Sequence, residues 1–311
     1  MGQISRRSAD PMFHLSPDGN EIILPHMSQT AYFLSDVHLR IEVDDVEIQR
    51  RKELFLLLDQ IKKEQATLFI VGDWFDFYFE YGSVVSQAYY DVYAKMRELI
   101  EAGIKIHFFG GNHDYWLGDF MSERLGVKIY LEGTSIVFDD KQFYLTHGDG
   151  LDPDDVNYRR MQTVLRHPLF IWAFRWILHP NIGHALARMI SRRSKKKYRG
   201  ETQEYLLRKV RKNYAFAEEQ LEAGADFFIT GHIHYPKLKK FENGVFLTIG
   251  DFLRYFTYGH YDGLNLSLKQ WPVKHLEQRE LPWLQAEFSI NWFDNFHVIE
   301  LGFDGIRHEA I

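Results

Sequence analysis

The chain has 311 residues, 45% hydrophobic and 26% charged, which excludes general disorder and leaves room for one large domain or two ordinary ones. Its 37 Lys and Arg are outnumbered by 43 Asp and Glu, which argues against a protein that coats nucleic acid through overall basicity. The chain contains no cysteine, which excludes disulfides, thiolate metal sites and a cysteine nucleophile, and fits a reducing compartment.

Residues 1–28 are polar, rich in turn formers and weakly patterned, so we expect an N-terminal extension that lies outside the core. No apolar run follows its charged residues, and no secretion signal is expected. The most apolar stretch, 169–178, is about half as long as the ~20 residues that a membrane-spanning helix needs, and Arg175 interrupts it. The sequence therefore predicts no membrane span.

Short apolar runs rich in β-branched and aromatic residues recur from residue 29 onward, and each ends against Gly, Asp or Ser. They predict buried strands at 31–34, 67–71, 104–109, 143–146, 226–230 and 245–249. Apolar residues at three- and four-residue spacing predict amphipathic helices at 46–63 and 84–102. Strands that alternate with helices indicate an α/β protein with its sheet covered on both faces.

The segment from about 155 to 223 shows helical periodicity only, which indicates a helical insertion on the α/β body. Two further apolar runs, 286–292 and 296–302, predict strands or a hairpin in the part of the chain after about 270. We therefore expect one domain over 29–311, with the insertion at 155–223 and additional strands near the C-terminus.

Polar residues collect directly after five of the predicted strands. In chain order they are Asp36 and His38, then Asp73, then Asn112 and His113, then His147, and finally His232 and His234. In an open α/β sheet, the loops at the carboxyl ends of the strands converge on one crevice, where ligands bind. We therefore expect these side chains to meet.

Seven of these residues are of metal-ligating type, and their mixture of imidazole and carboxylate favours Mn, Fe, Zn or Co. Seven ligands are too many for one ion but suit two, with Asp73 as the carboxylate that bridges them. Extended backbone would direct Asp36 and His38 to one side, and likewise His232 and His234. Each motif on its own could also be an ordinary turn or helix cap.

Two divalent ions with a bridging hydroxide would attack phosphorus, which predicts hydrolysis of a phosphate ester or anhydride. His113, beside Asn112 and Asp114, could donate a proton to the leaving oxygen or stabilise phosphoryl charge; alternatively, it only hydrogen-bonds within the turn. Asp251 and Asp149 could orient ligating histidines, Asp149 acting on His147.

The motifs Asp-x-His, Gly-Asp, Gly-Asn-His-Asp, His-Gly-Asp and Gly-His-x-His, in this order over roughly 29–252, resemble those of the calcineurin-like metallophosphoesterases. The resemblance implies a four-layer α/β/β/α sandwich in which the helical insertion forms a lid. It implies two metal sites that share Asp73. The first would be formed by Asp36, His38, Asp73 and His234, and the second by Asp73, Asn112, His147 and His232.

Within that superfamily the chain most resembles the UDP-2,3-diacylglucosamine pyrophosphatases of lipid A synthesis. The resemblance lies in SDVHL at 35–39, in HGDGLDPDDVNYRR at 147–160, and in the insertion with its cationic run. It implies Mn-dependent attack on the α-phosphorus of UDP-2,3-diacylglucosamine, releasing UMP and 2,3-diacylglucosamine 1-phosphate. It also implies substrate contacts from six residues, Asn112, His113, Asp155, Ser194, Lys197 and His232. That family usually has arginine where this chain has His113.

An apolar stretch at 169–190 precedes the run 188–199, which has seven cations and no acid. Together they could lie on an anionic membrane and admit acyl chains; the alternative is a core-facing helix followed by a solvated basic turn. We expect a cytoplasmic enzyme on the inner face of the inner membrane, with a nucleotide-lipid substrate and no nucleic-acid or obligate protein partner. The rival functions are hydrolysis of a soluble phosphodiester, nucleotide or nucleic acid, and a non-catalytic scaffold.

Overall fold

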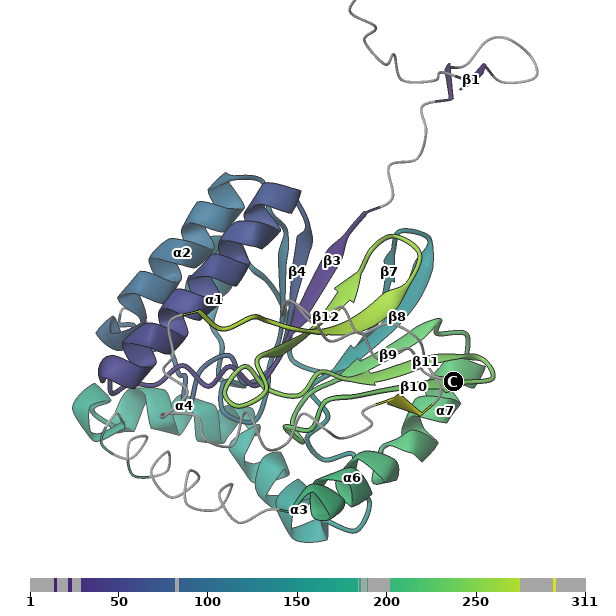
Figure 1. Ribbon diagram of the computed structural model, residues 1–311. Coiled ribbons are helices and arrows are strands. Elements are labelled where there is room, and N and C mark those ends of the chain that lie inside the picture. The colour runs from purple at the N-terminus through teal and green to yellow at the C-terminus, as the bar shows by residue number, and fades with distance from the viewer. Residues whose placement is uncertain are drawn as a thin grey trace, which may run out of the picture.

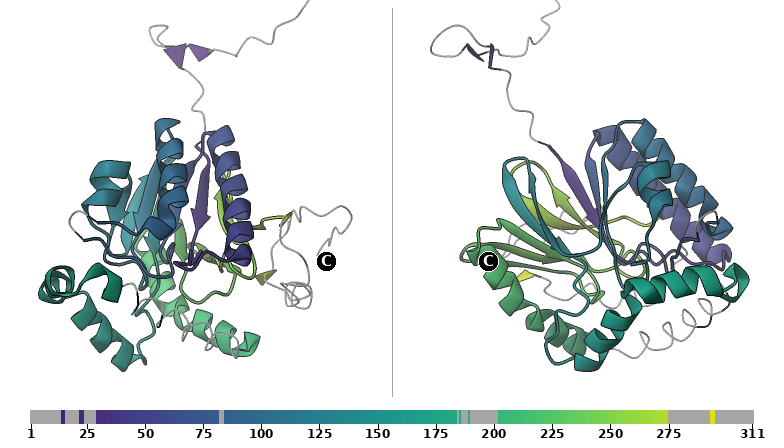
Figure 2. Two further views of the ribbon diagram at one scale, coloured as in Figure 1. Left: turned by 90° about the vertical axis from the view of Figure 1, so that its left-hand side faces the viewer. Right: turned by 180° about the vertical axis from the view of Figure 1, so that it is seen from behind.

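A computed structural model describes residues 14–15, 22–23, 29–81, 84–183, 185, 189, 202–274 and 293–294. Two six-stranded sheets face each other, and helices cover the outer face of each (Figures 1 and 2). The predicted α/β class and the four-layer arrangement are confirmed. A separate two-stranded sheet pairs β1 (His14–Leu15) with β2 (Ile22–Ile23).

The first sheet has the strand order β13-β12-β3-β4-β5-β6. Its parallel strands are β3 (Ala31–Leu34), β4 (Thr67–Val71), β5 (Ile106–Phe109) and β6 (Lys128–Tyr130). Two antiparallel strands, β12 (Thr257–Tyr261) and β13 (Leu266–Gln270), extend it beyond β3. Strands β3, β4 and β5 are thus neighbours and end at the same edge.

The second sheet has the order β14-β10-β11-β9-β8-β7. At its centre β8 (Lys141–Thr146), β9 (Phe227–Thr230) and β11 (Gly244–Thr248) run parallel. Strand β7 (Thr134–Phe138) is antiparallel to β8, and β10 (Lys237–Phe241) is antiparallel to β11. Strand β14 (Phe293–Asp294) pairs with β10 in parallel. The predicted strand pair at 286–292 and 296–302 lies outside the described residues.

The side chains of each central strand alternate between two cores, because successive residues of a strand point to opposite faces. On β3, Ala31 and Phe33 pack between the sheets, whereas Tyr32 and Leu34 pack against the helices. Phe33 stacks on Phe69 of the same sheet, with ring centroids 5.0 Å apart. These fully buried strands explain why the sequence shows continuous apolar runs rather than alternation.

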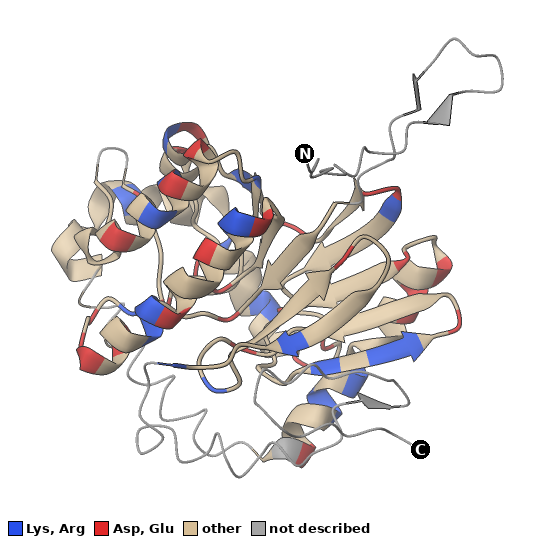
Figure 3. Cartoon of the chain, turned by 45° about the horizontal axis from the view of Figure 1, so that its top comes forward, with Lys and Arg blue, Asp and Glu red and all other residues tan. Residues whose placement is uncertain are grey.

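Helices α1 (Asp45–Glu64) and α2 (Tyr90–Glu101) cover the outer face of the first sheet. The helix predicted at 46–63 is confirmed as α1, which Asp44 caps by accepting from the backbone of Glu47. The helix predicted at 84–102 is shorter, because Val84 pairs with Tyr81 and a 3-10 turn η1 (Gln87–Tyr89) precedes α2. A π-helical turn, η2 (Phe120–Leu125), leads into β6. Charges of both signs mix along α1 and α2, whereas the strands are mostly uncharged (Figure 3).

The helical segment 155–223 divides into two parts. Helices α6 (Gln203–Lys212) and α7 (Tyr214–Glu222) pack on the outer face of the second sheet, where Val210 and Leu221 share a core with Phe228. Helices α3 (Val156–Leu165) and α4 (Pro168–Ile177) instead lie across the ends of the sheets (Figure 1). Among the described residues, no helix has the length and apolarity needed to cross a membrane.

Candidate metal centre

The seven predicted ligands follow the carboxyl ends of neighbouring strands. Asp36 and His38 follow β3, Asp73 follows β4 and Asn112 follows β5 in the first sheet; His147 follows β8, and His232 and His234 follow β9, in the second. Because β3, β4 and β5 are adjacent and so are β8 and β9, both sheets bring their loops to one edge. The seven side chains lie together there, as the following distances show.

Five of these residues adopt a left-handed backbone conformation, so the extended backbone expected for the pairs Asp36/His38 and His232/His234 is wrong. Their φ angles are 53° for Asp36, 46° for His38, 51° for Asp73, 69° for His232 and 57° for His234. This region is sparsely populated by residues other than glycine, and its cost is about 1–3 kcal/mol per residue. The sharp turns fold the loop after β3 against the loop after β4, where the amide of His38 donates to the carbonyl of Asp73 at 2.9 Å. As a consequence, the ring of His232 contacts Asn112, whereas the ring of His234 contacts Asp36.

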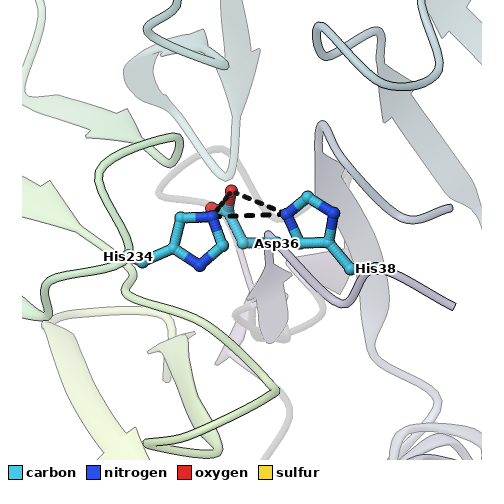
Figure 4. A group of neighbouring side chains, drawn as sticks. All are labelled: Asp36, His38 and His234. Atoms are coloured by element: carbon cyan, nitrogen blue, oxygen red, sulfur yellow. Dashed lines mark hydrogen bonds and ion pairs between the residues drawn. The ribbon is translucent and has the colours of Figure 1, made fainter. Parts of the chain in front are cut away.

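Asp36, His38 and His234 form one cluster of side chains that point toward one another (Figure 4). Nε2 of His38 and Nε2 of His234 are 3.3 Å apart, and Asp36 Oδ1 lies 3.4 Å from His234 Nε2 and 3.8 Å from His38 Nε2. Two donors that are each about 2.1 Å from a metal ion lie roughly 3.0–3.4 Å apart. The cluster therefore has the dimensions of a metal site.

One oxygen of Asp36 accepts no hydrogen bond among the described residues. Oδ1 is buried with no hydrogen bond among the described residues, whereas Oδ2 accepts from the amide of His232 at 2.9 Å. Burial opposes the ionisation of Asp36, but the imidazoles of His234 and His38 outweigh it and lower its pKa to about 2. An ionised oxygen in the interior that accepts no hydrogen bond is costly, and a cation held between it and the two imidazoles would stabilise it. The residues present thus fit a bound divalent ion.

His147, Asn112 and His232 form a second cluster. Oδ1 of Asn112 lies 3.1 Å from Nε2 of His147 and 2.9 Å from Nδ1 of His232. Nδ1 of His147 is 2.9 Å from the carbonyl of Val71, so this nitrogen donates its proton there and Nε2 faces the Asn112 oxygen. Gly72 permits this approach, because a Cβ at this position, where φ is +81°, would collide with the His147 ring.

Asp73 lies between the two clusters. Its Oδ2 is 3.6 Å from Nε2 of His38 and 3.4 Å from Nε2 of His147, while Oδ1 accepts from the amide of His113 at 2.9 Å. Burial opposes ionisation of this carboxyl, yet the neighbouring imidazoles, above all His147, hold its pKa well below the ordinary value. An ionised oxygen placed this way can contact an ion in either cluster.

Further groups orient the ligating rings. Nδ1 of His234 lies 3.1 Å from Oδ2 of Asp251, as anticipated from sequence, and Nδ1 of His38 lies 3.8 Å from Oδ1 of Asp76. The expectation that Asp149 orients His147 is wrong. Asp149 Oδ2 instead accepts hydrogen bonds from Tyr158 at 3.1 Å and Gln162 at 2.6 Å, both on helix α3, and from Arg166, directly after α3, at 2.7 Å. Asp149 therefore anchors α3 beside the centre.

His113 lies at the margin of the centre, with Nε2 4.0 Å from Asp73 Oδ2. Its Nδ1 is 2.6 Å from the carbonyl of Asp76, which fixes the ring. Burial alone would lower the pKa of His113, but the charge of Asp73 and the Asp76 carbonyl raise it above the ordinary value. A positively charged imidazole beside the clusters can stabilise charge on a bound phosphoryl group.

Sequence reasoning missed the roles of Asp114 and Asp76 in this centre. Asp114 is fully buried and accepts from the amides of Gly111 at 2.8 Å and Trp74 at 2.7 Å, which binds the loop after β4 to the loop after β5. The available signal was its place at the end of Gly-Asn-His-Asp, a motif whose chemistry was ascribed to Asn112 and His113 instead. For Asp76 the only signal was proximity in sequence to Asp73.

A mostly apolar cavity of about 410 Å³ opens beside the centre, between the loops after β4 and β5 and helices α3 and α4. Its lining includes Asn112 and His113 at one end and apolar residues along its walls, among them Phe77, Trp116, Leu165, Phe170, Phe174 and Leu178. A larger hollow of about 600 Å³ is lined by Thr67, Ile106 and Lys128, which begin strands β4, β5 and β6. It lies at the other end of the strands, away from the clustered ligands.

All six predicted substrate contacts remain predictions. Asp155 is exposed and caps α3 by accepting from the amide of Tyr158 at 3.0 Å. Ser194 and Lys197 lie outside the described residues.

The calcineurin-like phosphoesterase family matches residues 30–236. UDP-2,3-diacylglucosamine hydrolase from Porphyromonas gingivalis is 32% identical over 265 residues, 78% of this chain and 98% of that protein. The enzyme of the same name from Haemophilus ducreyi is 27% identical, over 71% of this chain and 91% of that protein. The solved structure of Yfce, a phosphoesterase from E. coli, covers 80% of this chain and 97% of that one at 14% identity, with a TM-score of 0.41. The chain belongs to the calcineurin-like phosphoesterases and is a metal-dependent hydrolase.

Proposed function

We propose that the protein hydrolyses the pyrophosphate of UDP-2,3-diacylglucosamine at a two-metal centre, with Mn²⁺ as the metal, giving UMP and 2,3-diacylglucosamine 1-phosphate. The names and coverage of the P. gingivalis and H. ducreyi relatives support this substrate class. The observation that carries the proposal is the apolar cavity beside the candidate centre, because acyl chains need an apolar space next to the phosphorus that reacts.

Two ligand sets would hold the ions, and they share Asp73. The first comprises Asp36, His38, Asp73 and His234, and the second Asp73, Asn112, His147 and His232; both follow the two clusters of contacts. When bound, such ions neutralise phosphoryl oxygens and activate water for attack in line with the leaving group. Mn²⁺ agrees with the mixture of imidazole and carboxylate ligands.

The chain's own residues would orient the substrate. His113 and Asn112 line the cavity where it meets the centre, so a pyrophosphate there would contact both. The ring of His113, held by the Asp76 carbonyl at 2.6 Å, would stabilise charge on the phosphoryl oxygens. The leaving phosphate is already a stable anion and needs no proton, so charge stabilisation is the larger part of this role.

The cavity walls would hold the acyl chains. Phe170, Phe174 and Leu178 recur every four residues on α4, which places them on the helix face that lines the cavity. Across the cavity, Trp116 lies against Phe174 with ring centroids 4.5 Å apart. Burial of apolar surface contributes about 25 cal/mol per Å², so two acyl chains would supply much of the binding free energy.

The opposite face of α4 supports contact with a membrane. Leu169, Trp172 and Trp176 follow a three- and four-residue spacing and are 70%, 57% and 76% exposed. A helix with one apolar face lining a cavity and another facing outward suits an enzyme that takes its substrate from a lipid surface. The proposal places the protein at the cytoplasmic face of the inner membrane.

Hydrolysis in water enriched in oxygen-18 tests the substrate and the position of attack. With Mn²⁺ present, UDP-2,3-diacylglucosamine should be cleaved and the heavy oxygen should appear in UMP, because attack is at the α-phosphorus. UDP-glucosamine without acyl chains should react with a kcat/KM at least about 100-fold lower, since the cavity would stay unfilled. Cleavage of bis-p-nitrophenyl phosphate, cyclic nucleotides or single-stranded DNA in preference to the acylated substrate would establish the rival function instead.

A further inference from the structure

A buried ionic network lies beneath the loop that follows β3. Its centre is Glu47 in the first turn of α1, which is fully buried and accepts from three arginines. Arg40 donates from Nε at 3.1 Å, Arg50 from Nη1 at 2.6 Å and Arg51 from Nε at 3.1 Å. Arg50 and Arg51 are themselves buried. Burial of three charges, those of Glu47, Arg50 and Arg51, is costly, so the network needs a reason beyond general stability.

Arg50 connects this network to the candidate metal centre. While Nη1 contacts Glu47, Nη2 donates a hydrogen bond to the carbonyl of Val37. Val37 is the residue between Asp36 and His38, both of which have left-handed backbone conformations. A donor on this carbonyl fixes the rotation of the peptide group between Val37 and His38, and a planar guanidinium can hold Glu47 and this carbonyl at once.

The charge of Arg50 also lies on the side of the network nearest the centre. Burial lowers the pKa of its guanidinium, while the carboxylate of Glu47 and, less strongly, those of Asp76 and Asp251 oppose that shift. Asp76 and Asp251 are the carboxylates beside Nδ1 of His38 and of His234. Arg50 is thus a fixed cation behind the side chains that orient these two histidines.

We propose that Arg50 is a positioning residue for the ion held by Asp36, His38 and His234, which it sets in place through the Val37 carbonyl. The inference rests on the two-metal centre proposed above and names the group that shapes one half of it. Within the part of the chain that the structure describes, Arg50 makes no hydrogen bond to the side chain of a predicted ligand. Its effect would pass through the backbone of the loop after β3, so the ion held by Asn112, His147 and His232 should not depend on it.

Arg51 provides a matched control. It belongs to the same network and is as deeply buried, but its remaining hydrogen bonds go to the carbonyls of Arg40 at 2.8 Å and Ala88 at 2.9 Å and to Asp91 at 2.7 Å. Among the described residues, Arg51 makes no hydrogen bond to Val37. If the network served stability alone, removing either arginine would lower the unfolding temperature and leave both ions equally well bound.

Titration of the purified protein with Mn²⁺, followed by electron paramagnetic resonance, tests the inference. The wild type should reach two ions per chain with the spectrum of a spin-coupled pair. Arg50→Met should weaken one ion by about 10- to 100-fold, the range seen when groups that orient ligands are lost, and should give an uncoupled single-ion spectrum at intermediate concentrations. Arg51→Met should keep the coupled pair even if its unfolding temperature falls.

Arg50→Lys keeps the positive charge, so it provides a second variant to measure if Arg50→Met does not fold. Because an ammonium group cannot hold Glu47 and Val37 in the same bidentate way, this variant should recover the fold but only part of the affinity for the weakened ion. A folded Arg50→Lys or Arg50→Met protein with unchanged affinity for both ions would overturn the inference. A wild type that binds only one ion would instead refute the two-metal centre itself.

Discussion

Oδ2 of Asp251 lies 3.1 Å from Nδ1 of His234, on the ring nitrogen that does not face Asp36. Its other oxygen accepts from the amides of Leu253 at 3.1 Å and Arg254 at 2.6 Å, which fixes the carboxylate in a tight turn after β11. Asp251 thereby determines which nitrogen of His234 carries the proton and which is left for a metal ion.

Asp251→Asn should weaken metal binding about 10- to 100-fold and leave the fold intact. The amide oxygen can still accept from Leu253 and Arg254, but the amide nitrogen cannot accept from Nδ1 of His234. Isothermal titration calorimetry with Mn²⁺ measures the affinity. The control is Asp59→Asn on α1, because Asp59 forms an ion pair with Lys95 and is not one of the residues of the centre. Equal affinities of the two variants would show that Asp251 has no part in the centre.

His113→Ala should lower kcat by about 10²- to 10⁴-fold while metal content stays at the wild-type level, because His113 would act on the substrate and not on the ions. His113→Arg should restore much of the rate, since a fixed cation at this position still stabilises phosphoryl charge. Steady-state kinetics with metal analysis of each variant gives the answer. Loss of metal in His113→Ala would place His113 among the ligands, contrary to this account.

Metal affinity should rise with pH through the neutral range. Burial alone would lower the pKa of His147, but the charge of Asp73 outweighs it and raises this pKa well above 6.5. At neutral pH His147 therefore binds a proton that a metal ion must displace, so binding releases a proton and tightens as pH rises. Titration calorimetry at pH 7 in two buffers of different ionisation enthalpy measures this release. An affinity that does not change between pH 6 and 8 would contradict it.

Replacing both outward tryptophans of α4, Trp172 and Trp176, with serine should reduce sedimentation with vesicles that contain anionic lipid. Hydrolysis of a water-soluble diester should be unaffected, because neither residue lines the cavity. Tyr90→Ser, which removes a side chain that is 76% exposed at the start of α2, provides the matched control for lost surface aromatic area. Retained sedimentation in the double variant would remove the support for membrane contact.

The candidate site was predictable because its signal is local. Asp36, Asp73 and His232 follow strands whose residues are all buried, and the apolar runs at 31–34 and 67–71 locate Asp36 and Asp73 at the strand ends. Topology then brings the loops together, as parallel strands of one sheet end at the same edge. Helix α1 was predictable for a similar reason, since its buried residues recur every three or four positions.

Other features depend on contacts that no local pattern records. Strand β6 has three residues, and β10 contains three lysines, so neither shows the apolar signal of a strand. The left-handed φ angles of Asp36 and His38 arise from hydrogen bonds to the loop after β4, which the sequence does not reveal. The charges of Arg50 and Glu47 resemble an ordinary exposed helical pair, and only the fold buries them beneath a ligand loop.

The number of metal ions per chain tests the central claim most directly. Metal analysis of Mn²⁺-loaded wild type should give two ions per chain. The Asp73→Ala variant should bind neither ion tightly, because Oδ2 of Asp73 lies 3.6 Å from Nε2 of His38 and 3.4 Å from Nε2 of His147 and would be a ligand of both ions. Two tightly bound ions in Asp73→Ala, or a single ion in the wild type, would contradict a centre built around this shared carboxylate.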